Sequence, residues 1–208
     1  MRIIPMVITN NYFKMANLFH VVGVCGRRCS GKDTIASILN ELYGYENIKI
    51  SNELKDALKI IFGFSHDQIE GTLKDIVDVQ WGISPRQAMQ FIGTEVMQYK
   101  ITELLPDMGR KFWIKAFINK HISGNKYHDK LLVITDVRFI HEYEELKMHL
   151  NNDLMMLRVE RNFQSHHMKG VDEHASEQEY LKIPVDHIIT NNGSKNELSK
   201  KLQNIFGV

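Results

Sequence analysis

The chain has 208 residues, 43% of them hydrophobic, and its 26 basic and 25 acidic side chains leave a formal net charge of +1. This length suits one domain, with room for an inserted subdomain, and the apolar content is ample for one core. Near-neutral charge gives no sign of the broad basic surface that nucleic-acid binding requires. The two cysteines, Cys25 and Cys29, make no disulfide framework, and no stretch is long enough to span a membrane. We therefore expect a globular protein of the reducing cytoplasm.

Residues 1–17 are expected to form an N-terminal extension. Their apolar run is interrupted by Pro5 and by Asn10-Asn11, and it lacks the small-residue cleavage site of a signal peptide. The folded domain is therefore expected to span residues 18–208.

Residues 18–24 are apolar and β-branched, which predicts a buried strand. A basic loop follows, and the spacing from Gly26 to Gly31-Lys32 is that of the phosphate-binding loop (P-loop), G-x-x-x-x-G-K-[ST]. Such a loop turns its backbone N–H groups toward one anion, and the next helix adds its positive N-terminal end. We therefore expect ATP binding, with Lys32 on the terminal phosphates, by a set of eight residues: Gly26, Arg28, Cys29, Ser30, Gly31, Lys32, Asp33 and Thr34.

The residue after Lys32 departs from the motif. A Ser or Thr normally stands there and ligates Mg²⁺ through its hydroxyl, whereas this chain has Asp33 followed by Thr34. Either Asp33 takes over part of the metal or substrate handling, or Thr34 is shifted into that role. The alternative without a ligand is a glycine-rich turn between a strand and a helix.

Beyond the loop, helical and strand patterns alternate. Helices are predicted over residues 32–43, 53–62 (with Ser51 or Asn52 as cap), 84–104, 111–122 and 140–150, and a last helix follows Ser194, which forms a capping box with Glu197. Strands are predicted over 48–50, 131–136, 154–159 and 187–190, and 65–83 reads as a loop with a short helix. This alternation predicts a doubly wound, mostly parallel sheet in a three-layer α/β/α fold.

Several polar residues directly follow the predicted strands, where ligands bind in such sheets. Asp136 resembles the Walker B carboxylate that holds Mg²⁺ directly or through water, so the expected metal residues are Asp33, Thr34 and Asp136. Arg138 and Glu142 would share a helix face, either as a surface ion pair or with Arg138 on a second phosphate. Arg161 has the position of a lid arginine that stabilises transferring charge, within a lid-like loop at about 161–184.

Other candidates have alternatives that the sequence leaves open. Arg86 opens the helix at Ser84-Pro85 and could bind a monophosphate or simply face solvent. Trp113 is more typical of a core than of a base-stacking platform. His166, His167 and His174 have no cysteine beside them, so we do not expect a zinc site.

Short blocks in the same order, from about Val21 to Phe206, make the chain resemble the phage-type deoxynucleoside monophosphate (dNMP) kinases, which phosphorylate dNMPs to dNDPs with ATP. The blocks are residues 30–34 (SGKDT), 54–58 (LKDAL), 86–94 (RQAMQFIGT), 112–117 (FWIKAF), 136–138 (DVR) with 141–142 (HE), 174–177 (HASE) and 189–194 (ITNNGS).

The resemblance implies a P-loop nucleoside monophosphate kinase fold, ATP and Mg²⁺, a small nucleotide as substrate and a homodimer. It also implies a helical acceptor-binding region at about 53–122. Arg28 stands where the family has Lys, and Ser-Gly-Lys-Asp is usual there. The resemblance implies that the catalytic residues of this chain are Lys32, Arg28, Asp33, Arg138 and Arg161. It implies that the dNMP-binding residues are Leu54, Lys55, Arg86, Gly93, Thr94, Trp113, Asp136, Val137, Arg138 and Glu142.

Two other functions stay open. Animal-type phosphomevalonate kinases share Ser-Gly-Lys-Asp, an Asp-x-Arg after a strand, and elements of 170–177, but they are less similar over 86–94 and 112–113. An ATP-binding regulatory switch would need no second phosphate site. A nucleic-acid end kinase would require a basic groove, which the net charge does not suggest.

Overall fold

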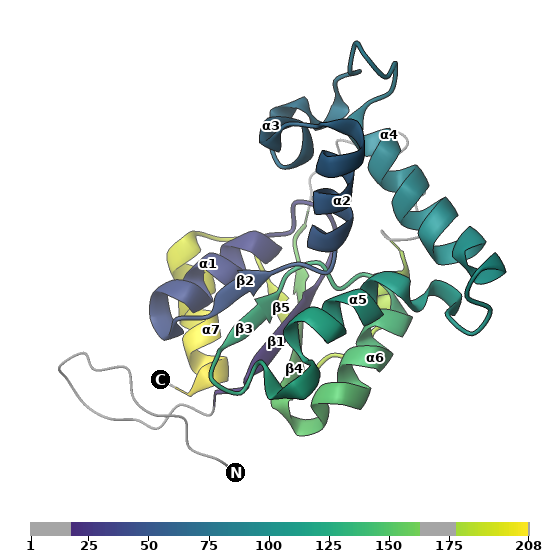
Figure 1. Ribbon diagram of the computed structural model, residues 1–208. Helices are drawn as coiled ribbons and strands as arrows, with labels where there is room; N and C mark the ends of the chain where they lie inside the picture. The colour runs from purple at the N-terminus through teal and green to yellow at the C-terminus, as the bar shows by residue number, and fades with distance from the viewer. Residues whose placement is uncertain (1–17, 163–177, 208) are drawn as a thin grey trace. The chain divides into compact units, whose positions relative to one another are not determined.

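A computed structural model describes residues 18–162 and 178–207 (Figure 1). The chain divides into two compact units, unit 1 with Met1–Lys49 and Gly124–Val208, and unit 2 with Ile50–Ser123. Within the described residues, no helix combines the length and the apolar character needed to cross a bilayer. The expected extension at 1–17 and most of the expected lid, 163–177, lie outside the described residues.

Unit 1 is built on a five-stranded parallel sheet with the order β2-β3-β1-β4-β5. The strands are β1 (Val21–Cys25), β2 (Glu46–Ile48), β3 (Leu132–Ile134), β4 (Leu154–Glu160) and β5 (His187–Thr190). β1 is central and pairs in parallel with β3 and β4. All five residues of β1 are buried, as expected for a strand covered on both faces. The prediction of a doubly wound parallel sheet is confirmed.

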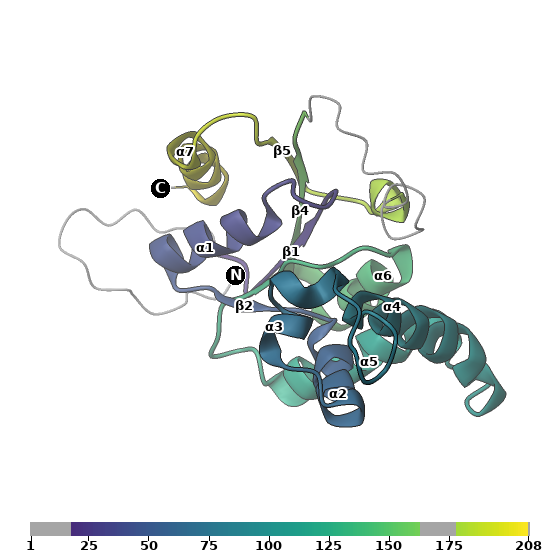
Figure 2. The same cartoon turned by 90° about the horizontal axis from the view of Figure 1, so that it is seen from above.

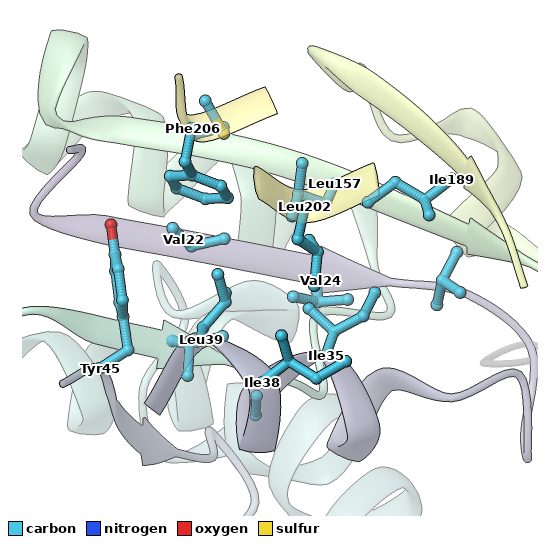
Figure 3. Close-up of a cluster of buried hydrophobic side chains, with 14 of the residues drawn as sticks. Val22, Val24, Ile35, Ile38, Leu39, Tyr45, Leu157, Ile189, Leu202 and Phe206 are labelled. Carbon is cyan, nitrogen blue, oxygen red and sulfur yellow. The ribbon is translucent and has the colours of Figure 1, made fainter. Parts of the chain in front are cut away.

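Helices cover both faces of this sheet (Figure 2). α1 (Lys32–Tyr43) and α7 (Lys195–Phe206) lie on one face, and α6 (Ile140–Leu150) packs against β4 on the other. Figure 3 shows the core between the sheet and the first pair of helices. It contains Val22, Val24, Ile35, Ile38, Leu39, Tyr45, Leu157, Ile189, Leu202 and Phe206, all essentially inaccessible to solvent. The three-layer prediction is therefore confirmed for unit 1.

Two predicted helices have the bounds that the sequence indicated, α1 and α6, and α1 ends at Gly44 in the left-handed conformation. β2 differs, because it covers 46–48 instead of 48–50. Glu46 donates its N–H to Leu131 O at 2.7 Å, so pairing with β3 begins at polar residues that carry no apolar signal. At the start of α7, Ser194 Oγ accepts the N–H of Glu197, which is one of the two bonds of the predicted capping box.

Unit 2 is helical, with α2 (Asn52–Phe62), α3 (His66–Ile69), α4 (Pro85–Gln90) and α5 (Phe112–His121). 3₁₀ turns η1 (Thr72–Asp75), η3 (Lys100–Glu103) and η4 (Gly109–Lys111) connect them. α3 and η1 occupy the region that we predicted as a loop with one short helix. The small core of unit 2 contains Leu54, Leu58, Phe64, Ile69 and Ala88.

One prediction in unit 2 is wrong. The single helix expected over 84–104 is α4, then a nine-residue π-helix η2 (Phe91–Tyr99), then η3. Apolar spacing indicated a helix over this segment, but it did not show that the backbone hydrogen bonds would follow the i→i+5 pattern. Ser84 Oγ accepts the N–H of Gln87 and caps α4, with Pro85 in its first turn, whereas Ser51 makes no side-chain cap bond to α2.

Candidate active site

The loop between β1 and α1 has the backbone conformation that the P-loop motif predicts. Gly26 has φ 148° and Gly31 φ 109°, values that side chains rarely adopt, and Cys29 between them has φ 61°. A Cβ on Gly31 would lie 2.2 Å from Asn191 Nδ2, and one on Gly26 would lie 2.5 Å from Val159 O. Both glycines are therefore required by conformation and by space.

Lys32 folds back over this loop. Its Nζ donates to the carbonyl oxygens of Gly26 at 2.7 Å and of Arg27 at 2.8 Å. These bonds hold the ammonium group beside the loop's own backbone. The positive charge of the lysine therefore lies next to the place where the loop's N–H groups can bind an anion.

Ser30 is completely buried at the centre of the loop. Its backbone carbonyl accepts a 2.8 Å hydrogen bond from Asn191 Nδ2, at the end of β5. Its hydroxyl is buried without a hydrogen-bond partner among the described residues, so it retains a donor for a ligand in the loop. Asn191 was within a family block of the sequence, but no role was assigned to it.

Asp33 is tied to the ends of two strands. Lys49 Nζ, after β2, lies 2.8 Å from Asp33 Oδ1, and Thr135 Oγ1, after β3, donates to the same oxygen at 3.3 Å. Thr135 Oγ1 also lies 3.2 Å from Asn47 Oδ1. Burial disfavours the charged carboxylate, but the bonds and charge from Lys49, with Thr135 and Lys32, outweigh it and lower the pKa of Asp33. Sequence reasoning missed Lys49 and Thr135, because only the folded sheet brings them to Asp33.

The loop after β3 carries Asp136, Val137 and Arg138, and Glu142 organises it. Glu142 Oε2 accepts the backbone N–H of Arg138 at 2.7 Å and of Phe139 at 3.0 Å. Glu142 is buried, and Asp136 and Arg138 are partly exposed. Desolvation, reinforced by the charge of Asp136, outweighs those bonds and the charge of Arg138 and raises the pKa of Glu142 to about 8. The alternative of a surface ion pair is wrong for Glu142, which caps the loop from inside.

The remaining unit 1 candidates lie in the P-loop, on the helix that follows it and after β4. Thr34 is partly exposed on the first turn of α1, Arg28 is partly buried within the P-loop, and Arg161 is exposed directly after β4. Cys25 is buried and Cys29 exposed, and both are free thiols. Burial raises the pKa of the Cys25 thiol to about 11, so it is an inert packing group.

In unit 2, three predicted site residues contact one another. Gly93 lies in η2, where a Cβ would come within 2.6 Å of Leu54 Cδ2, on α2. Trp113 Nε1, on α5, donates to Gly93 O at 2.9 Å. The absence of a side chain at Gly93 therefore lets η2 approach Leu54 closely, and Trp113 secures the contact. Thr94 follows on the π-helix and is partly exposed.

The two cationic candidates of unit 2 are both paired with acids. Lys55 is buried, and its Nζ lies 2.9 Å from Glu70. Arg86 makes a bidentate interaction with Asp75, in which Nε donates to Oδ1 and Nη2 donates to Oδ2. This is the geometry in which a guanidinium also grips a phosphate.

The structure thus groups the predicted residues in two sets. Unit 1 holds the P-loop, the Asp33 cluster and the Asp136–Glu142 loop, and unit 2 holds Leu54, Lys55, Arg86, Gly93, Thr94 and Trp113. The histidines 166, 167 and 174 and the block 174–177 lie outside the described residues.

Comparison with solved structures gives only distant likenesses. A shikimate kinase from Acinetobacter baumannii in complex with shikimate has 17% identity and a TM-score of 0.45, over 91% of this chain and 93% of that one. A dephospho-CoA kinase from Campylobacter jejuni has 21% identity and a TM-score of 0.47, over 90% and 97%. Likenesses this loose say nothing about the acceptor. A search of curated proteins finds no match.

A family model gives the assignment. The model of deoxynucleotide monophosphate kinase matches residues 62–202, which include β3, β4, β5 and most of unit 2. The P-loop at Gly26–Lys32 stands before the matched range. This chain, a P-loop phosphotransferase, belongs to the deoxynucleotide monophosphate kinase family.

Proposed function

We propose that this kinase transfers the γ-phosphoryl group of ATP to a deoxynucleoside monophosphate and releases a dNDP and ADP. The observation that carries the proposal is the P-loop, with Lys32 held over it and the buried Ser30 hydroxyl without a hydrogen-bond partner among the described residues. The family match over residues 62–202 supports the choice of acceptor.

The chain's own groups supply binding and charge. Backbone N–H groups of residues 26–32 and the Lys32 ammonium hold the triphosphate, and Arg28 and Arg161 neutralise charge that develops during transfer. The candidate ligands of the acceptor phosphate are Arg138 in unit 1 and Arg86 in unit 2, and the other dNMP-binding residues of the resemblance are the candidates for the nucleoside. The acceptor oxygen attacks the γ-phosphorus in line, so positioning does most of the work and no covalent intermediate on the protein is required.

The donor set of unit 1 fits a magnesium ion. Mg²⁺ prefers oxygen ligands and is usually held by one or two carboxylates together with nucleotide phosphates and water. Asp136 and Thr34 offer a carboxylate and a hydroxyl after β3 and on α1, and Asp33 offers a second carboxylate that already pairs with Lys49. When bound, the ion neutralises phosphate charge during transfer.

The test is coupled ADP release with ATP and Mg²⁺ against a panel of dNMPs, NMPs and phosphomevalonate. Turnover with one or more dNMPs is the expected result. Turnover with phosphomevalonate alone would assign the chain to that activity, and ATP binding without any acceptor-dependent turnover would favour a regulatory switch.

A matched pair of variants ties the activity to the loop. Lys32→Ala should abolish transfer and leave the fold intact. Lys195→Ala removes an exposed lysine of α7 that pairs with Glu41 in the last turn of α1, and it should keep normal turnover. Near-normal turnover by Lys32→Ala would remove the P-loop assignment. The homodimer that the resemblance implies stays a prediction, which light scattering after size-exclusion chromatography would test.

A further inference from the structure

The carboxylate of Asp33 is an unusual charge beside a loop that binds anions. It follows Lys32 directly on the first turn of α1, and its side chain is 72% exposed. Arg27, Arg28 and Lys32 make the loop positive, and a free carboxylate next to them would repel a triphosphate. Another group must therefore compensate the negative charge of Asp33 if the loop is to bind a triphosphate well.

Lys49 supplies the compensating charge. It stands immediately after β2, its side chain is 28% exposed, and its Nζ lies 2.8 Å from Asp33 Oδ1. Thr135 donates to the same oxygen from the end of β3, so the carboxylate is held by both neighbouring strand ends. The ammonium cancels the carboxylate's charge, and the hydrogen bonds turn Oδ1 toward β2 and β3.

We propose that Lys49 is a positioning residue for nucleotide binding, which neutralises Asp33 and so preserves the positive potential of the P-loop toward the phosphates. The proposal rests on the assignment of the ATP site to this loop. It adds Lys49, from the end of β2, to the groups that determine nucleotide affinity, although Lys49 acts through Asp33 and touches no phosphate itself.

A purely structural ion pair would behave differently. Exposed pairs contribute little to folding stability, so loss of this one should hardly change the melting temperature. If the pair only held the local structure in place, removal of either partner would lower ATP affinity. If it balances charge, Lys49→Met and Asp33→Asn must shift ATP affinity in opposite directions.

The experiment measures binding of a fluorescent ATP analogue, and of ADP by competition, in EDTA, so that neither metal ligation nor catalysis enters. We expect Lys49→Met to weaken binding about five- to tenfold, as a unit charge several ångströms from the phosphates would at a surface dielectric. Asp33→Asn should bind at least as tightly as the wild type, and Asp33→Asn with Lys49→Met should return to within about twofold of it.

Two further measurements sharpen the result. Lys49→Arg keeps the charge and should bind nearly as the wild type does, and the loss in Lys49→Met should shrink at high salt, because Asp33 is exposed to screening ions. Lys195→Met, which removes an exposed lysine that pairs with Glu41, is the control. Melting temperatures verify that each variant is folded.

Unchanged affinity in Lys49→Met, or a double variant as weak as Lys49→Met, would overturn the proposal. The assay remains valid if no dNMP is phosphorylated, because it follows nucleotide binding alone. A wild-type protein that binds neither nucleotide would overturn this proposal together with the assignment of the ATP site.

Discussion

The side-chain amide of Asn191 donates a 2.8 Å hydrogen bond to the backbone carbonyl of Ser30, which lies 161 residues earlier in the chain. Asn191 is buried, and its Nδ2 occupies the space that a side chain on Gly31 would need. The end of β5 therefore supports the P-loop at the residue where its backbone is most constrained.

Asn191→Ala should lower both stability and ATP affinity. The substitution leaves the Ser30 carbonyl buried without its partner, which costs about 1–3 kcal/mol, and it frees the loop to move away from its binding conformation. Denaturant unfolding and nucleotide titration measure the two effects. Asn196→Ala, at an exposed position on α7, is the control and should change neither. If Asn191→Ala is destabilised but binds ATP normally, Asn191 contributes to stability and not to nucleotide binding.

Gly93→Ala should destabilise unit 2. The added methyl would meet Leu54 Cδ2 at 2.6 Å, and Leu54 is confined in the small core of this unit. Overpacking of this kind costs about 1–3 kcal/mol, and it would also displace the carbonyl that Trp113 binds. Urea unfolding followed by tryptophan fluorescence reports the change.

Gly193→Ala is the matched control for this substitution. Its methyl would meet only the end of the exposed Glu197 side chain, which can move away. We expect a change within about 0.5 kcal/mol, as for most surface substitutions. Equal losses in the two variants would contradict the close approach of η2 to Leu54.

The pair of Arg86 and Asp75 allows a test of Arg86 as an acceptor-phosphate ligand. The Arg86 side chain is 30% exposed, and Asp75 occupies its two-pronged donor face. If a phosphate competes with Asp75 for that face, Arg86→Ala should raise the acceptor KM and Asp75→Asn should lower it, while the KM for ATP stays unchanged. Steady-state kinetics with each substrate varied separately decides this. Loss of stability in both variants with unchanged KM would make the pair structural.

Arg138→Ala should raise the acceptor KM or lower kcat far more than it affects ATP binding. Its backbone N–H is held by Glu142, so its position after β3 does not depend on its own side chain. Arg158→Ala, on β4, is the comparison, since Arg158 pairs with Glu160 and has no assigned role. Equal effects of Arg138→Ala on both substrates would argue against an acceptor role.

The sequence predicted those elements whose signals are local. The bounds of α1 follow from apolar residues at helical spacing and from Gly44, which ends the helix in a left-handed conformation. The order of strands and helices likewise predicted the parallel sheet. The P-loop glycines could be recognised because Gly26 and Gly31 stand at the spacing that the motif requires, and their φ values agree with it.

The parts that were missed depend on contacts between distant residues. Lys49 meets Asp33, and Asn191 meets Ser30, only after β2 and β5 have joined the sheet, so the sequence alone does not pair these residues. The apolar spacing over η2 indicates a helix, but it does not show which hydrogen-bond pattern the backbone adopts. Spacing did bring Arg138 and Glu142 together, but it could not show that Glu142 is buried and binds backbone.

Glu142 gives a prediction about pH. Its pKa is about 8 in the folded protein against an ordinary value of 4.5, because burial disfavours the carboxylate. A raised folded pKa means that the folded state holds the proton more tightly than the unfolded chain does. The stabilisation from this group is therefore complete below about pH 4.5, declines through the neutral range and is lost above about pH 8.

Glu142→Gln carries a permanently neutral group of the same shape, whose amide oxygen can still accept the N–H groups of Arg138 and Phe139. It should remove this part of the pH dependence, so that the variant is more stable than the wild type at pH 8.5 and similar at pH 5. Glu142→Ala lacks the acceptor and should be less stable than Glu142→Gln at both values. Denaturant unfolding across pH 4.5–9 measures all three proteins. Parallel stability curves for the wild type and Glu142→Gln would show that Glu142 is ionised throughout, with the two backbone N–H bonds outweighing the cost of burial.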